Sequence, residues 1–149
     1  MIKDKISLGI AGELLVASKL SELSLIVGVT RKNTQNVDIL VSDGINTRNI
    51  QVKTTRQGQQ WVCPRPKIVH NNFIYIFVNM NKETTSIPEF HIVPSETVNK
   101  IMKIGYDQWN KKYFERHGHY YDESKGGVSH FEDYELKYKD KWNNLKLII

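Results

Sequence analysis

The chain has 149 residues, of which 40% are hydrophobic and 25% are charged, a composition typical of one soluble globular domain. No apolar run approaches the roughly 20 residues of a membrane-spanning helix, no secretory signal pattern opens the chain, and a single cysteine, Cys63, excludes an internal disulfide. We therefore expect a cytoplasmic protein without a membrane segment, whose net charge of +5 favours polyanionic partners.

Residues 6–24 show helical periodicity, because apolar side chains recur at steps of three and four. The expected apolar stripe consists of Ile6, Ile10, Leu14, Ala17 and Leu20. Glu13 falls inside this stripe, where a buried carboxylate is costly unless it meets a cation, a metal ion or several donors. Glu13 is therefore a candidate site residue, and Gly12 beside it permits close approach of another segment. The alternative is a Glu at the edge of the stripe whose carboxylate reaches water.

A strand is expected at 25–32 and a β-hairpin at 36–55. The pair Asp43-Gly44 joins two arms rich in β-branched and aliphatic residues, which is the usual pattern of a hairpin turn. Side chains alternate along each arm. On the first arm the expected apolar row is Val37, Ile39 and Val41, and on the second it is Ile50, Val52 and Thr54.

Three polar residues remain on the other faces of these arms, namely Asp38, Gln51 and Lys53. If the register brings Asp38 across from Gln51 or Lys53, a carboxylate, an amide oxygen and an ammonium group converge. Hard oxygen ligands beside a lysine suit a divalent cation and a water molecule that attacks a phosphate. The alternative is an ordinary half-exposed hairpin with polar residues turned outward.

The order Gly12-Glu13 on a helix, Asp38 on one hairpin arm and Gln51-x-Lys53 on the next resembles the PD-(D/E)XK nuclease superfamily. The Gln-x-Lys form is similar to the branch that includes Mrr-type restriction enzymes, and the resemblance covers about residues 6–80. It implies an endonuclease that hydrolyses phosphodiester bonds of DNA with Mg²⁺ or Mn²⁺. Asp38, Gln51 and Glu13 would then hold the ion, and Lys53 would serve the attacking water. The resemblance also suggests a homodimer, because cutting both strands of a duplex usually takes two active sites.

Two residues depart from the pattern of this superfamily. Val37 stands in the place of the Pro, and Gln51 replaces the usual acid, which removes a charge from the ligand set. A second function therefore stays open: a catalytically inactive nuclease-like fold that binds nucleic acid or another protein. A third is an interaction subunit that docks a partner through its aromatic C-terminal segment.

The distribution of charge supports a nucleic-acid partner. No Asp or Glu occurs between residues 44 and 82, whereas this span contains Arg48, Lys53, Arg56, Arg65, Lys67 and Lys82. The field around Lys53 should therefore be positive, as the approach of a phosphate requires. Arg48, Arg56, Arg65 and Lys67 are candidate nucleic-acid contacts, and the alternative is a chance clustering of solvated side chains.

The remaining elements complete the predicted fold. Two nearby prolines make a helix unlikely at 55–72, so a short strand around Trp61 or a loop should replace the helix that the superfamily has there. Apolar residues at 73–80 predict a central strand, another strand follows at 88–93, and Ser95 should cap a helix that ends near residue 103. We expect an α/β (α+β) fold with a mixed, mainly antiparallel sheet of five or six strands flanked by helices. The single domain would have a core at 6–104 and a helical, aromatic-rich extension at 105–149.

The C-terminal segment has two groups of aromatic residues at helical spacing. They are Tyr106, Trp109 and Tyr113, and then Phe131, Tyr134, Tyr138 and Trp142. Such stripes usually belong to a core or to a packing surface, and base stacking is the functional alternative. His117, His119 and His130 are expected to be ordinary loop residues, because a zinc site wants about four ligands at close spacing.

Overall fold

The computed structural model describes residues 2–30, 36–66, 68–83, 85–125 and 129–149. Its elements follow in chain order: α1 (Ile2–Glu22), β1 (Ile26–Val29), β2 (Ile39–Ser42), β3 (Thr47–Thr55), β4 (Gln60–Val62), β5 (Phe73–Asn79), β6 (Glu89–Pro94), α2 (Ser95–His117), β7 (His130–Glu132), and two 3-10 turns, Glu123–Lys125 and Trp142–Leu145. None of the helices in these ranges is long and apolar enough to cross a membrane.

Five strands form the main sheet in the order β1-β2-β3-β5-β6. The pairs β1–β2, β2–β3 and β5–β6 are antiparallel, and β3–β5 is parallel. The predicted mixed, mainly antiparallel sheet flanked by helices is therefore confirmed. Every residue of β5 is buried, as expected of a central strand that is apolar on both faces.

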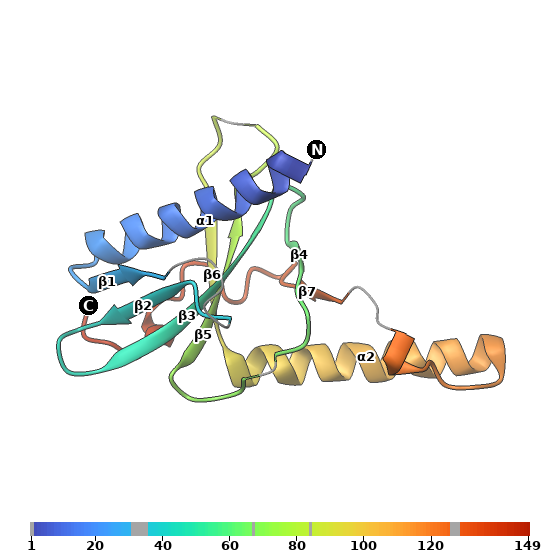
Figure 1. Cartoon of the computed structure of the whole chain (residues 1–149). Coiled ribbons are helices and arrows are strands. Elements are labelled where there is room, and N and C mark those ends of the chain that lie inside the picture. The colour runs from blue at the N-terminus through green and yellow to red at the C-terminus, as the bar shows by residue number, and fades with distance from the viewer. Residues whose placement is uncertain (1, 31–35, 67, 84, 126–128) are drawn as a thin grey trace.

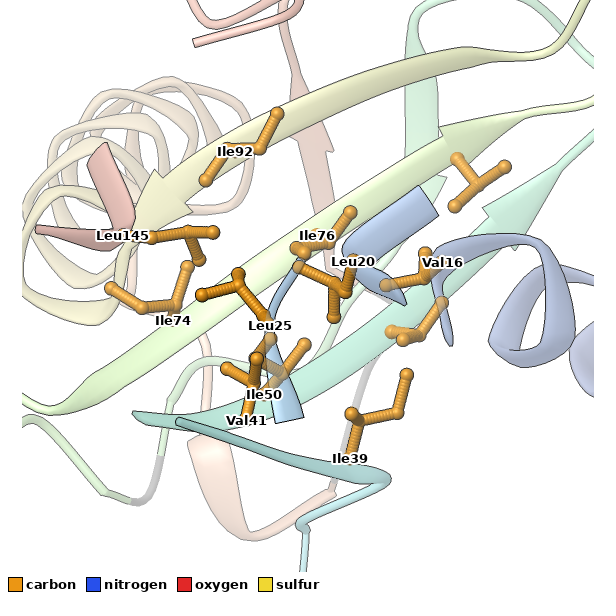
Figure 2. Close-up of a cluster of buried hydrophobic side chains, with 12 residues drawn as sticks. Val16, Leu20, Leu25, Ile39, Val41, Ile50, Ile74, Ile76, Ile92 and Leu145 are labelled. Atoms are coloured by element: carbon orange, nitrogen blue, oxygen red, sulfur yellow. The ribbon is translucent and has the colours of Figure 1, made fainter. Parts of the chain in front are cut away.

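Each face of the sheet is covered by a different layer (Figure 1). The first core lies under α1 and contains Val16, Leu20, Leu25, Ile39, Val41, Ile50, Ile74, Ile76, Ile92 and Leu145 (Figure 2). The second core lies on the opposite face, between the sheet, β4, β7 and α2, and contains Trp61, Cys63, Phe73, Tyr75, Phe77, Val93, Met102 and Phe131. Successive residues of β5 point into alternate cores, which is the strand period of two.

The apolar stripe predicted for α1 is wrong. Val16 and Leu20 are fully buried and Gly12 is buried with them, whereas the predicted Ile6, Ile10 and Leu14 are exposed. The reason is a close contact at Gly12, where an added Cβ would overlap the side-chain oxygen of Thr54 on β3. This contact rotates the line 12-16-20 towards the sheet, since residues four apart share a helix face.

The predicted hairpin is confirmed, with Ile39 paired to Ile50 across it. The Asp43 carboxylate closes the turn by accepting hydrogen bonds from the backbone N–H groups of Ile45 and Asn46. The preceding strand is shorter than predicted, and residues 31–32 of that prediction lie outside the described residues. Val37 also differs from the prediction, because it packs against the second core rather than beside Ile39. It precedes β2, so the alternation of that strand does not extend to it.

The predicted strand around Trp61 is confirmed as β4. It pairs with β7 in a separate two-stranded sheet, which covers the second core. The indole N–H of Trp61 donates to the carbonyl of Val78 at 2.9 Å, which fastens this layer to the central strand. His91 of β6 lies beneath it and forms a buried 2.6 Å hydrogen bond with Asp133. The sequence did not predict a partner for His91.

Helix α2 is longer than predicted, because it continues to His117. Ser95 does not cap it: no side-chain bond caps this end, and the Ser95 hydroxyl donates to the carbonyl of His70 instead. The helical stripe predicted for 131–142 is wrong. Phe131 belongs to β7, and left-handed backbone angles at Leu136 and Asp140 break any helix between them.

Glu89 fastens the end of β6 to three neighbouring segments. Its carboxylate accepts hydrogen bonds from Gln59, Asn79 and Lys139. Burial alone would raise the pKa of Glu89, but these bonds outweigh it and lower the pKa from 4.5 to about 2. A lowered pKa in the folded state means that the ionised carboxylate stabilises the fold above about pH 4.5, and that this contribution is lost as the pH falls towards 2.

We expect Glu89→Gln to lower the free energy of unfolding by about 1–2 kcal/mol at pH 7, because each pKa unit corresponds to about 1.4 kcal/mol and partial exposure to water weakens the pairing. Urea unfolding between pH 7 and pH 2.5 measures it, with the exposed Glu135→Gln as control. The difference from the wild type should shrink below about pH 4. A difference that stays constant with pH would contradict this role.

Candidate functional site

Asp38 lies where the pairing of β2 with β3 ends. Its backbone N–H donates to the carbonyl of Ile50 at 2.8 Å, and its Oδ2 accepts a 2.7 Å hydrogen bond from the N–H of Val52. The pairing of Ile39 with Ile50, extended by one residue, places Asp38 opposite Gln51. The carboxylate is thus tied to the backbone of the strand that carries the other candidate residues.

Gln51 and Lys53 share one face of β3, as predicted from alternation. Ile50 and Val52 point into the first core, so Gln51 and Lys53 face the opposite side, where they pair in register with Tyr75 and Phe77 of β5. Both side chains are half-buried. The Asp38 carboxylate therefore meets the backbone of β3 between the residues that carry this amide and this ammonium group.

The charge of Asp38 is only partly compensated. Burial raises the pKa of Asp38, while the hydrogen bond from Val52 and the Lys53 ammonium lower it, and burial prevails. A carboxylate that is desolvated in this way gains from any further positive charge nearby. A cation placed beside Asp38 would therefore lower this pKa.

The sequence did not single out two further residues next to this group. Tyr75 is buried beside Gln51, and burial raises its pKa, to which the charges of Cys63 and Asp38 add. Burial also raises the pKa of the Cys63 thiol to about 11, against the effect of Lys53. Cys63 is thus a buried thiol of the second core. One feature of the sequence could have identified Tyr75 as a site residue: it carries a hydroxyl group in the middle of a strand that is otherwise almost entirely apolar.

Glu13 is placed by the contact between Gly12 and Thr54. This contact sets α1 over the C-terminal end of β3, so Glu13 lies near that end of the strand. Helix α1, however, covers one face of the sheet, and Gln51 points from the other face. The β2–β3 pairing stops at Ile50, and the two faces of the sheet meet at the edge beyond it. Glu13 is half-buried, and its approach to Asp38 stays a prediction.

The predicted nucleic-acid contacts have different environments. Arg48 points towards the first core, where its guanidinium donates to the carbonyls of Thr47, Leu145 and Lys146, so the structure does not bring it to Lys53. Arg56 is exposed just after β3. Arg65 is also exposed, and its Nε donates to Asn99 of α2. Lys67 lies outside the described residues.

The available donors fit a hard divalent cation. Asp38 and Glu13 offer carboxylate oxygens and Gln51 an amide oxygen, the ligand types that Mg²⁺ and Mn²⁺ prefer. Across the described ranges, no group of three or more His, Cys, Asp or Glu side chains is placed to hold a metal ion. In the ligand set expected from the sequence, the amide of Gln51 would supply the third protein oxygen.

Comparison with known proteins supports the fold. No family model matches the sequence, and no curated protein matches it. Among solved structures, a bacterial homing endonuclease, I-Ssp6803I, matches with a TM-score of 0.59 over 93% of this chain and 91% of that chain, at 10% sequence identity. At this identity the likeness shows the fold alone: the chain has a nuclease-like fold.

The contact at Gly12 can be tested with a second glycine of the same helix. We expect Gly12→Ala to lower the free energy of unfolding by about 1–2 kcal/mol, because overpacking against Thr54 outweighs the better helix propensity of Ala. An added Cβ at Gly9 meets nothing within 4 Å, so Gly9→Ala should raise it by about 0.5–1 kcal/mol. Chemical denaturation of both variants measures these changes. Equal effects of the two substitutions would show that α1 does not pack as described.

Proposed function

We propose that the protein is a metal-dependent endonuclease of the PD-(D/E)XK type that acts on DNA. The observation that carries the proposal is that Asp38 accepts a hydrogen bond from the backbone of β3 between Gln51 and Lys53, within a nuclease-like fold. The order of these residues is the one for which the superfamily is known. Fold and residue pattern are independent observations, and both favour the same chemistry.

The roles of the side chains follow from their chemistry. Asp38, Gln51 and Glu13 would hold Mg²⁺ or Mn²⁺, which supplies Lewis acidity towards a phosphodiester. Lys53 would position the attacking water, and its ammonium would offset the negative charge that develops on the phosphate oxygens. The hydrogen bond from Val52 keeps the Asp38 carboxylate in one orientation, so the site need not reorganise to receive the ion.

DNA is the substrate that the charge and the neighbour favour. The net charge is +5, the span from 44 to 82 contains no acid, and the structural neighbour is a homing endonuclease. Exposed Arg56 and Arg65 are available for phosphate contacts, and Lys67 is proposed from the sequence alone. Cleavage of both strands would require a homodimer or two successive encounters.

Gln51 favours a second candidate, a nuclease-like protein that binds nucleic acid without cutting it. The neutral amide makes the ligand set less negative than the usual pair of acids, and the affinity for a divalent cation decreases as charged ligands are lost. Such a module would bind DNA with an affinity that depends on salt. It would be indifferent to metal ions and to the loss of Asp38.

The experiment incubates purified protein with supercoiled, linear and branched DNA in Mg²⁺, Mn²⁺ or EDTA. We expect cleavage that requires the metal ion and that falls at least about 100-fold in Asp38→Asn and in Lys53→Met, since each removes a group that stabilises the transition state. The exposed Asp107→Asn serves as the matched control and should cleave like the wild type.

Two results would overturn the proposal. The first is cleavage by Asp38→Asn at the rate of the control, which would point to a contaminating nuclease. The second is the absence of cleavage together with DNA binding that neither metal ions nor Asp38→Asn affects. The second result would select the binding module instead.

A further inference from the structure

The aromatic stripe of α2, formed by Tyr106, Trp109 and Tyr113, is not part of either core. α2, which the structure describes in full, buries Ser95, Val98 and Met102, and beyond Met102 it extends away from the main sheet (Figure 1). Trp109 lies in this second half and is 46% exposed. This stripe therefore forms a packing surface, one of its two predicted roles, rather than part of a core, and the exposed ring of Trp109 needs a further explanation.

The rings are nevertheless held in fixed positions. Trp109 lies 6.0 Å from Tyr106 and 5.4 Å from Tyr113 along the helix, measured between ring centroids. Tyr121, on the segment that returns along α2, meets Trp109 edge-on at 5.2 Å. The backbone N–H of Tyr121 donates to Asn110 Oδ1 at 2.9 Å, which fastens the returning segment to the helix. The rings thus form a preorganised surface.

This surface is one wall of a cavity of about 650 Å³ between α2 and β7. Tyr106, Trp109 and Tyr121 supply aromatic rings, and Arg65, His130 and Glu132 supply polar groups. Small-molecule sites have volumes of about 300–1,000 Å³ and combine apolar walls with a few polar groups. The cavity therefore has the size and composition of a ligand site.

The polar groups are partly uncommitted. Glu132 accepts from Gln60 through Oε1, and Arg65 donates to Asn99 through Nε. Within the described ranges, no hydrogen bond is formed by the terminal amino groups of Arg65. A ring stacked on Trp109 would meet donors from Arg65 and acceptors from Glu132 at its edge, which are the groups that proteins use to recognise the edges of bases.

We propose that this cavity binds an unpaired nucleobase. A purely apolar ligand would leave the terminal amino groups of Arg65 without a hydrogen-bond partner, whereas a simple ion would leave the aromatic wall of the cavity unused. A nucleobase has both a face that stacks on aromatic side chains and an edge with donors and acceptors. The inference rests on the proposed action on DNA, since it names an unpaired base as a feature that the nuclease would recognise.

The cavity lies on the same face of the sheet as Gln51 and Lys53. β7 lines it through His130 and pairs with β4, and the backbone N–H of Cys63 donates to the carbonyl of Ser129 at 2.9 Å. The positive charge of Lys53 in turn acts to lower the pKa of the Cys63 thiol, so these two side chains are neighbours. A DNA strand bound in the cavity would thus continue towards the candidate catalytic edge.

The test measures fluorescence anisotropy of a labelled duplex with one unpaired nucleotide against the same duplex fully paired, in EDTA so that no cleavage occurs. We expect the wild type to bind the duplex with the unpaired nucleotide at least about fivefold more tightly, as stacking of one base provides. Trp109→Leu should abolish this preference. Phe114→Leu, which removes an exposed ring of α2 stacked on Tyr120 beyond the end of the helix, should retain it.

Competition with free mononucleotides identifies the source of the base. If they abolish the preference, the cavity accepts a free nucleotide, and if they do not, the base must belong to a DNA chain; both outcomes agree with the proposal. Should Trp109→Leu fail to fold by circular dichroism, Tyr106→Leu replaces it.

Three results would overturn the proposal. The first is equal affinity of the wild type for both duplexes, and the second is a preference that Trp109→Leu retains. The third is a protein dimer, detected by sedimentation, that dissociates in Trp109→Leu while DNA binding stays unchanged. The cleavage assay is independent of these results. Cleavage without a preference would remove the cavity proposal alone, and a preference without cleavage would remove the nuclease alone.

Discussion

The hydrogen bond from the Val52 N–H to the Asp38 carboxylate is the interaction on which the candidate site depends. It forms just before β2 begins, so the Asp38 carboxylate takes the place of a further strand residue as the partner of β3. A single hydrogen bond thereby fixes Asp38 relative to Gln51 and Lys53, because Val52, which donates it, stands between these two residues in β3. Burial at the same point raises the pKa of Asp38 and outweighs the opposite effects of this hydrogen bond and of the Lys53 ammonium.

The two cores around the sheet serve the site in different ways. The first core holds α1 against β3 through Val16, Leu20 and the contact at Gly12, which sets the level of Glu13. The second core is built from large aromatic side chains under β4 and β7. It encloses the face of Gln51 and Lys53 and lowers the local dielectric, which strengthens electrostatic interactions with a phosphate or an ion.

Sequence patterns predicted the features that depend on local periodicity. The hairpin, the shared face of Gln51 and Lys53, and the buried strand β5 all follow from the alternation of residues along a strand. The patterns failed where distant contacts decide. The stripe of α1 was misplaced because Thr54, far along the chain, sets the rotation of the helix. Phe131 was assigned to a helix because its pairing partner in β4 leaves no local sign. The partners of Arg48 and His91, near residues 145 and 133, were equally invisible to local reasoning.

The position of a bound metal ion tests the account most directly. A crystal soaked in Mn²⁺ and measured at the manganese absorption edge would locate the ion by its anomalous signal. The account predicts an ion within about 2.5 Å of an Asp38 carboxylate oxygen, with the amide oxygen of Gln51 as a second ligand. An ordered crystal at saturating Mn²⁺ with no ion at Asp38, or with Gln51 turned away from the ion, would contradict it.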